Sequence, residues 1–204
     1  MRLVRLFGLP VAVLCSSLAI VACGGGGGND DSAQITDVIQ TSAKSTDPAD
    51  CTKLETQQFV EQTELASGQA AIQQCQKSAA DTSDDPTSVD VTDVKSSGNT
   101  GSANVTFHGG SFDGSTLSVS LSKDGDQWKL DKITDIPNFN FAGLVQALTA
   151  RFNAESNIPP QVASCITQAF TNAGADQVKS IILSGNGDQL TALFSTCIPS
   201  GSTG

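Results

Sequence analysis

Residues 117–130, Leu117-Ser118-Val119-Ser120-Leu121-Ser122-Lys123-Asp124-Gly125-Asp126-Gln127-Trp128-Lys129-Leu130, alternate apolar and polar side chains on both sides of an Asp-Gly pair. Strict alternation is typical of a β-strand that is buried on one face. An Asp-Gly pair between two such runs is typical of a tight hairpin turn. The stretch therefore predicts two antiparallel strands with a shared apolar face, and this face decides the fold.

The same period of two extends toward the N-terminus. Val89 and Val91 alternate with polar residues, and so do Ala103, Val105 and Phe107, with a turn over residues 97–101. We therefore expect a four-stranded antiparallel meander within residues 89–136, with a second face rich in Ser, Thr and Asn. The residues expected on the apolar face are Val89, Val91, Ala103, Val105, Phe107, Leu117, Val119, Leu121, Trp128 and Leu130.

A sheet with one apolar face needs a second layer to cover it. Residues 34–80 have helical spacing, beginning with Ile35, Val38 and Ile39. Asp47-Pro48 breaks this pattern, and Asp50 is expected to cap a helix that begins near Cys51. A last short helix is expected over residues 70–79. We predict that these helices cover the sheet and that residues 34–136 form one domain.

Helical spacing returns over residues 139–198. A first helix carries Phe141 to Phe152, and a second opens at Pro159-Pro160. A third is expected around Val178 to Ile182, and a fourth around Leu190 to Cys197. The expected fold class is α+β: helices packed on a curved antiparallel four-stranded sheet, followed by a small helical domain. Residues 199–204 are expected to be a disordered tail.

The first 22 residues have the three zones of a secretory signal. Arg2 and Arg5 are followed by a short apolar run and then by small residues that lead to Cys23. This order is typical of a signal peptide, and the run is too interrupted for a membrane-spanning helix. Residues 23–33, which include Gly24–Gly28, are expected to be a flexible tether.

Ile20-Val21-Ala22-Cys23 resembles the lipobox of bacterial lipoproteins. The resemblance implies that the Cys23 thiol receives a diacylglyceryl group and becomes the N-terminus after cleavage. Two acyl chains hold a protein stably on a membrane, whereas one holds it weakly. We therefore expect a lipid-anchored protein on the extracytoplasmic face of the cell membrane, or on an outer membrane if the host has one.

Charge narrows the choice of partners. All 21 acidic residues follow Ala22, and they outnumber the basic residues of the same part of the chain by 12. So acidic a chain is repelled by nucleic acid and by anionic lipid head groups. We therefore expect no nucleic-acid partner. We also expect the lipid, rather than the surface charge, to hold the protein on the membrane.

Four cysteines remain after Cys15, in the signal, and Cys23: these are Cys51, Cys75, Cys165 and Cys197. An even number in an oxidising compartment predicts disulfides, and four cysteines allow three pairings. Cys51–Cys75 with Cys165–Cys197 is favoured because each pair stays within one segment. Either alternative would tie the two segments together. A zinc site would need closely spaced Cys or His ligands, which the chain lacks, so we expect no metal.

The helices followed by a meander that ends in Lys123-Asp124-Gly125-Asp126-Gln127-Trp128-Lys129-Leu130 resemble nuclear-transport-factor-2-like (cystatin-like α+β roll) domains of bacterial lipoproteins. Their last hairpin commonly carries Lys-x-Asp-Gly-x-Trp-Lys-Leu, and here one extra residue precedes Trp128. The terminal segment with its two cysteines looks like a helical unit at the ends of secreted actinobacterial proteins.

The resemblance implies isomerases and cyclases among the relatives, and these need an acid or base within the cone. The chain has no Tyr, and the expected cone-facing residues are apolar. His108, the only histidine, falls on the opposite polar face by alternation. We therefore expect no enzyme and no cofactor.

Two functions other than catalysis stay open. The first is a non-catalytic binding or scaffolding module with a protein partner. The second is a carrier of a small apolar ligand, whose pocket in the cone would be lined by Val105, Phe107, Val119, Leu121 and Trp128.

Overall fold

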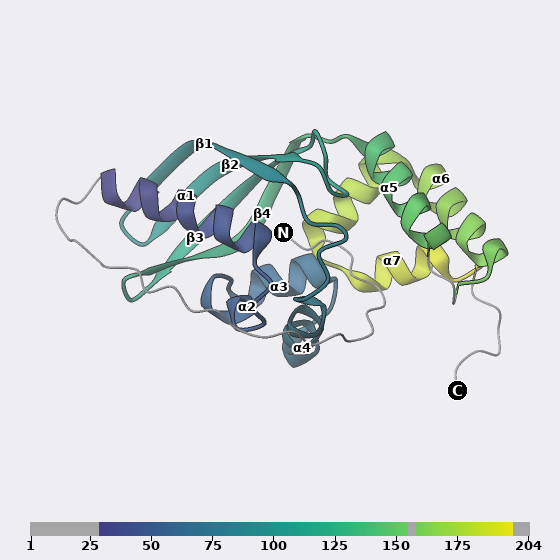
Figure 1. Ribbon diagram of the computed structural model, residues 1–204, viewed down its shortest axis with the longest axis horizontal. Helices are drawn as coiled ribbons and strands as arrows, with labels where there is room; N and C mark the ends of the chain where they lie inside the picture. The colour runs from purple at the N-terminus through teal and green to yellow at the C-terminus, as the bar shows by residue number, and fades with distance from the viewer. Residues whose placement is uncertain (1–28, 155–157, 198–204) are drawn as a thin grey trace.

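The computed structural model describes residues 29–154 and 158–197 (Figure 1). The helices of this part are α1 (Asn29–Lys44), α2 (Asp50–Lys53), α3 (Gln57–Glu64), α4 (Gly68–Ser78), α5 (Phe141–Ala154), α6 (Pro160–Ser184) and α7 (Gly187–Phe194). The strands are β1 (Ser88–Ser97), β2 (Thr100–His108), β3 (Thr116–Asp124) and β4 (Gln127–Asn138). The α+β fold class expected from the sequence is confirmed.

The four strands form one antiparallel sheet in the order β1-β2-β3-β4, joined by consecutive connections. Val91 pairs with Val105, Val105 with Leu117, and Leu121 with Leu130, so the predicted apolar positions lie side by side. Their side chains are buried on β2, β3 and β4, whereas the residues between them are exposed or half-buried. The apolar face predicted from the alternation is confirmed, although Val91 on β1 is only half-buried.

Helix α1 covers the apolar face of the sheet and touches both β1 and β4 (Figure 1). Its Ile35 and Ile39 are buried, and Ile35 lies against Gly101 of β2. A Cβ atom at Gly101 would stand 2.8 Å from Ile35 Cδ1 and 3.1 Å from the Trp128 ring. The helix therefore approaches the sheet closely at a position where β2 has no side chain. It begins at Asn29, within the stretch expected to be tether.

The helix expected from about Cys51 is divided into α2 and α3. The chain between them adds a short parallel bridge to β4, which interrupts the helix at Glu55. Thr56 caps α3 by accepting a hydrogen bond from the Phe59 N–H at 3.3 Å. Asp50 was expected to cap the preceding helix, but Ala49 takes that position and Asp50 lies in the first turn.

Helices α5, α6 and α7 stand beyond the end of the sheet where β4 finishes (Figure 1). The second and third helices expected in this segment are joined as α6, with a kink at Gly174, where φ is 75° and ψ is 171°. Gly185 ends α6 in the left-handed conformation that favours glycine. We call α5, α6 and α7 together the terminal helical unit.

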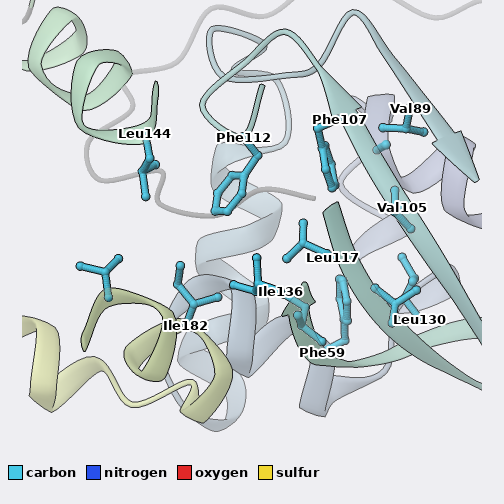
Figure 2. Packing of buried hydrophobic residues seen from close by; sticks show 14 of the residues in the cluster. Phe59, Val89, Val105, Phe107, Phe112, Leu117, Leu130, Ile136, Leu144 and Ile182 are labelled. Atoms are coloured by element: carbon cyan, nitrogen blue, oxygen red, sulfur yellow. The ribbon is translucent and has the colours of Figure 1, made fainter. Parts of the chain in front are cut away.

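One continuous apolar core connects the sheet with the terminal helical unit (Figure 2). Phe112, from the loop between β2 and β3, lies between Phe107 on the sheet and Leu144 on α5. Within the terminal helical unit, the rings of Phe170 and Phe194 stack with their centroids 5.5 Å apart. The two segments that the sequence separates as domains therefore share buried surface.

Candidate functional site

The five residues predicted to line a pocket lie together on the buried face of the sheet. Their side chains are 1–2% exposed and belong to the continuous core; they are Val105, Phe107, Val119, Leu121 and Trp128. Phe59 of α3 is fully buried in the same cluster (Figure 2). A ligand site among these side chains stays a prediction, and it requires the core to open.

Trp128 is held at the end of this interior by Asp31 of α1. The indole Nε1–H donates to Asp31 Oδ1 at 3.1 Å, and Lys123 Nζ donates to the same oxygen at 2.8 Å. Lys123 also lies 5.3 Å from the centre of the Trp128 ring, a distance typical of a cation–π contact. The hydrogen bond from Lys123, and then that from Trp128, lowers the pKa of Asp31 below its ordinary value.

The second face of the sheet carries interlinked polar side chains. Asn104 Nδ2 donates to Asp93 at 2.8 Å, and Ser118 Oγ donates to Asn104 Oδ1 at 2.7 Å. The Thr106 and Thr116 hydroxyls are 2.9 Å apart. We call this surface the polar sheet face; its residues are Asp90, Thr92, Ser102, Asn104, Thr106, His108, Thr116, Ser118, Ser120, Ser122, Lys129, Lys132 and Thr134. All of them are exposed or half-buried.

His108 lies on the polar sheet face, as the alternation predicts. Its Nε2 is 2.8 Å from Asp90 Oδ2, and its side chain is 47% exposed. An exposed His–Asp pair on neighbouring strands is an ordinary cross-strand contact.

The outer edge of β4 is covered at successive positions. The Thr56 N–H donates to the Leu130 carbonyl, and the Leu130 N–H donates to the Leu54 carbonyl, both at 2.8 Å. Farther along the strand, Lys179 Nζ of α6 donates to the Ile136 carbonyl at 2.8 Å. Such cover prevents another strand from pairing with this edge.

Gln62 of α3 covers the same edge between these two positions, and it is only 4% exposed. Its Nε2 donates to the carbonyls of Ile133 and Leu183, each at 2.9 Å, and its Oε1 accepts from the Ile133 N–H at 2.7 Å. One side chain thus joins α3, β4 and α6. Sequence reasoning missed this residue because a glutamine in an amphipathic helix gives no signal of such a role.

The opposite edge, β1, is irregular. The pairing with β2 shifts between Thr92 and Lys95, and Asp93 has a φ of 52°, which is rare outside glycine. A bulge with charged residues is typical of an edge strand that avoids pairing with other chains. We therefore take the polar sheet face, rather than the β1 edge, as the candidate surface for binding a partner.

Arg151 of α5 links the terminal helical unit to the loop after α4. Its guanidinium bonds Asp81 at 3.1 Å and forms an ion pair with Asp84. Asp84 also accepts a hydrogen bond from the Ser111 hydroxyl at 2.8 Å. The Arg151 side chain is 12% exposed, so this pair is better shielded from water than a surface salt bridge.

Two hollows differ in character. An open one of about 640 Å³ lies between the end of α1 and the start of β1, lined by exposed residues such as Asp37, Thr41 and Lys44. An enclosed one lies where Phe112 meets α5 and α6, with an entirely apolar lining and a volume of about 20 Å³. The enclosed cavity has room for about one water molecule, so it is too small for an organic ligand.

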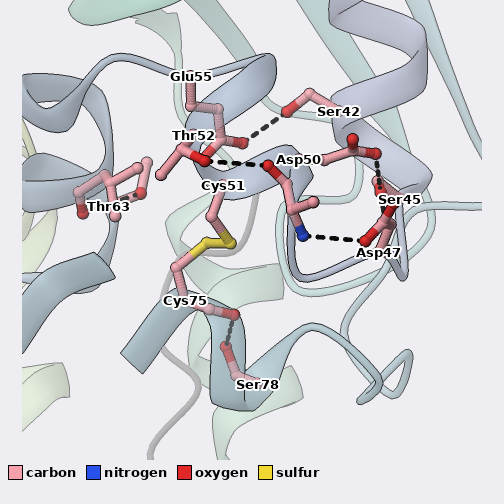
Figure 3. The surroundings of a disulfide bond; sticks show 12 residues. Ser42, Ser45, Asp47, Asp50, Cys51, Thr52, Glu55, Thr63, Cys75 and Ser78 are labelled. Atoms are coloured by element: carbon pink, nitrogen blue, oxygen red, sulfur yellow. Dashed lines mark hydrogen bonds between the residues drawn. A yellow bond between two sulfur atoms is a disulfide. The ribbon is translucent and has the colours of Figure 1, made fainter. Parts of the chain in front are cut away.

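Both favoured disulfides are present. Cys51 and Cys75 join α2 to α4 with Cα atoms 6.1 Å apart (Figure 3). Cys165 of α6 bonds Cys197, which follows α7, with Cα atoms 5.5 Å apart. Each bridge closes a loop within one segment, so the contact between the segments depends on packing and on polar links such as those of Gln62, Arg151 and Lys179.

Cys23, the signal over residues 1–22 and the tail over residues 199–204 lie outside the described residues. None of the helices that the structure describes combines the length and the apolar character needed to span a bilayer. Within the same ranges, His, Cys, Asp and Glu side chains form no group of three that could hold a metal ion.

Comparisons with models of known protein families, with curated proteins and with solved structures gave no match. A functional assignment therefore depends on the geometry of this chain.

Proposed function

We propose that this protein is a non-catalytic binding or scaffolding module that a diacylglyceryl group on Cys23 anchors to the extracytoplasmic face of a membrane. The observation that carries the proposal is the filled interior of the curved sheet. Trp128, Phe59 and Phe107 are at most 2% exposed there, so the fold offers its outer surface rather than a cavity. The export signal and the lipobox-like stretch of the sequence supply the location.

The nuclear-transport-factor-2-like relationship is part of the same proposal. An α-helical layer on a curved antiparallel sheet is compatible with it. A scaffolding protein with that fold would have the same helical layer, and apolar side chains would fill its cone. A carrier of an apolar ligand needs an open cone, so the packed interior favours the scaffold.

The polar sheet face is the surface that we propose for the partner, a protein. It presents hydroxyl and amide groups that form hydrogen bonds, with charges of both signs at Asp90 and Lys132. Hydrogen bonds and complementary charges give an interface specificity. The four strands hold these side chains in a fixed arrangement.

Photo-crosslinking in living cells tests this function. A photoreactive residue at exposed Ser102 should capture one defined protein, and Ser120→Arg on the neighbouring strand should abolish the capture. Ser164→Arg is the matched control, because Ser164 is an exposed residue of α6. Capture that persists in Ser120→Arg would contradict the assignment of the surface. A stoichiometric apolar ligand in the purified, delipidated protein would instead support the carrier.

A further inference from the structure

We infer that the molecule stands on the membrane with one particular end toward the lipid surface. This end, which we call the hairpin end, consists of the β1–β2 turn, the β3–β4 turn and the start of α1. The terminal helical unit is then directed away from the bilayer. The inference rests on the proposed lipid anchor at Cys23 and extends it by naming the surface that faces the lipid.

The chain between the proposed lipid anchor and the folded part is short. Helix α1 begins at Asn29, six residues after Cys23. A fully extended chain spans at most about 3.6 Å per residue, so Asn29 stays within about 22 Å of the anchored residue in any conformation. This limit follows from covalent geometry alone.

The start of α1 lies at one end of the sheet, beside the β3–β4 turn. Asp31, in the first turn, accepts hydrogen bonds from Lys123 at 2.8 Å and from Trp128 at 3.1 Å. Both partners flank the β3–β4 turn, so the start of α1 is fastened to that turn. The β1–β2 turn lies at the same end of the sheet, because Thr100 pairs with Ser122.

The strands separate the hairpin end from the other end of the sheet. The strands contain 9 to 12 residues, which at about 3.3 Å per residue corresponds to roughly 30–40 Å. The terminal helical unit follows β4 beyond that far end, and α1 begins at the opposite side of the molecule (Figure 1). The tether therefore keeps the hairpin end within reach of the lipid, and the helical unit lies at the other end of the sheet.

The surface of the hairpin end is polar. Residues 96–100 and 124–127 are all exposed, and none of them is apolar. Asp124 and Asp126 lie at the second turn, and the Asp124 carboxylate pairs with Lys129 at 2.9 Å. Such a polar surface gains nothing by entering the hydrocarbon layer. The hairpin end therefore faces the head groups without inserting.

Energy transfer to the membrane tests this orientation. The acylated full chain would be placed in phosphatidylcholine vesicles that contain an acceptor-labelled lipid. A donor dye would be attached through an unnatural amino acid at Gln127, at the hairpin end, or at Gln161, on α6. Both glutamines are exposed, so they form a matched pair. We expect several-fold more transfer from position 127, and a fall at that position when Gly24–Gly28 is duplicated.

Equal transfer from the two positions, or more from position 161, would overturn the orientation while leaving the anchor intact. Flotation of the vesicles separates this failure from a failure of the proposed function. Protein that does not float with the vesicles has no lipid anchor, and that result would overturn both the anchor and the orientation. Transfer from position 127 that is insensitive to the longer tether would also contradict the inference.

Discussion

Gln62 and Ile133 are joined by two hydrogen bonds: the Gln62 amide donates to the Ile133 carbonyl at 2.9 Å, and the Ile133 N–H donates to Gln62 Oε1 at 2.7 Å. The side chain therefore pairs with the β4 backbone as a neighbouring strand would. Its third hydrogen bond, to the Leu183 carbonyl, brings the end of α6 to the same place. This buried side chain fastens the terminal helical unit to the sheet.

Gln62→Ala should therefore destabilise the protein strongly. The change leaves the N–H and carbonyl of Ile133 and the carbonyl of Leu183 without this partner, and we expect a loss of about 2–4 kcal/mol. Denaturant unfolding followed by Trp128 fluorescence would measure it. Gln58→Ala, at an exposed position of the same helix, should change stability by less than about 0.5 kcal/mol. Equal effects of the two changes would mean that the Gln62 contacts contribute little.

The strand register predicts an unequal response at two positions of the sheet. Trp128 is 2% exposed, so Trp128→Ala should cost about 3–5 kcal/mol. His108→Ala should cost less than about 1 kcal/mol, because the side chain lies on the exposed face and its pair with Asp90 is screened by water. Thermal unfolding followed by circular dichroism compares the two variants. The reverse order would show that the register is wrong.

The lowered pKa of Asp31 predicts how stability responds to acid. The unfolded carboxyl keeps its ordinary value near 3.8, whereas the hydrogen bonds from Lys123 and Trp128 lower the pKa in the folded state. The ionised group therefore stabilises the fold above pH 4, and this contribution is lost as the pH falls through the folded-state pKa. Asp31→Asn should be less stable than the wild type at pH 7, and the difference should shrink toward pH 2.

Unfolding measured at several pH values checks this response. Asp30→Asn is the control, because Asp30 is exposed and adjacent in sequence. It should leave the acid-induced loss of stability as large as in the wild type. A constant difference between Asp31→Asn and the wild type at every pH would contradict the linkage to the Asp31 carboxylate.

The two disulfides should contribute separately. They close loops with sequence separations of 24 and 32, for which chain entropy predicts about 3–4 kcal/mol each. We expect Cys165→Ser with Cys197→Ser to loosen the terminal helical unit first, because that bridge joins α6 to the residue that follows α7. Hydrogen exchange of α6 and α7 measures this loosening, and the pair Cys51→Ser and Cys75→Ser is the comparison. Faster exchange in the sheet than in the terminal helical unit would contradict the expectation.

The sheet could be predicted from the sequence because its signal is local. Each strand repeats with a period of two, and the Gly125-Asp126 turn, closed by the Asp124–Gln127 pair, fixes the pairing of the last two strands. The disulfide pairing also followed from composition, since each pair of cysteines lies in one segment with its own helical pattern. These features depend on residues that are near each other in the chain.

The joint between the segments could not be predicted, because it depends on contacts between distant residues. Gln62 and Arg151 are ordinary polar residues of amphipathic helices, and their partners lie 71 and 70 residues away in the chain. The division of α2 from α3 has the same origin, since the chain near Glu55 pairs with β4. Periodicity reports which face of an element is buried, but not which distant element buries it.

The lipid anchor is tested most directly by the mass of the N-terminal peptide of the mature protein, compared between the wild type and Cys23→Ala. We predict that the wild-type peptide begins at Cys23, carries a diacylglyceryl group and comes from the membrane fraction. Cys23→Ala should lack the lipid and lose stable attachment to the membrane. A wild-type chain that keeps residues 1–22 or carries no lipid, or a Cys23→Ala variant that is still acylated, would contradict the lipid anchor at Cys23.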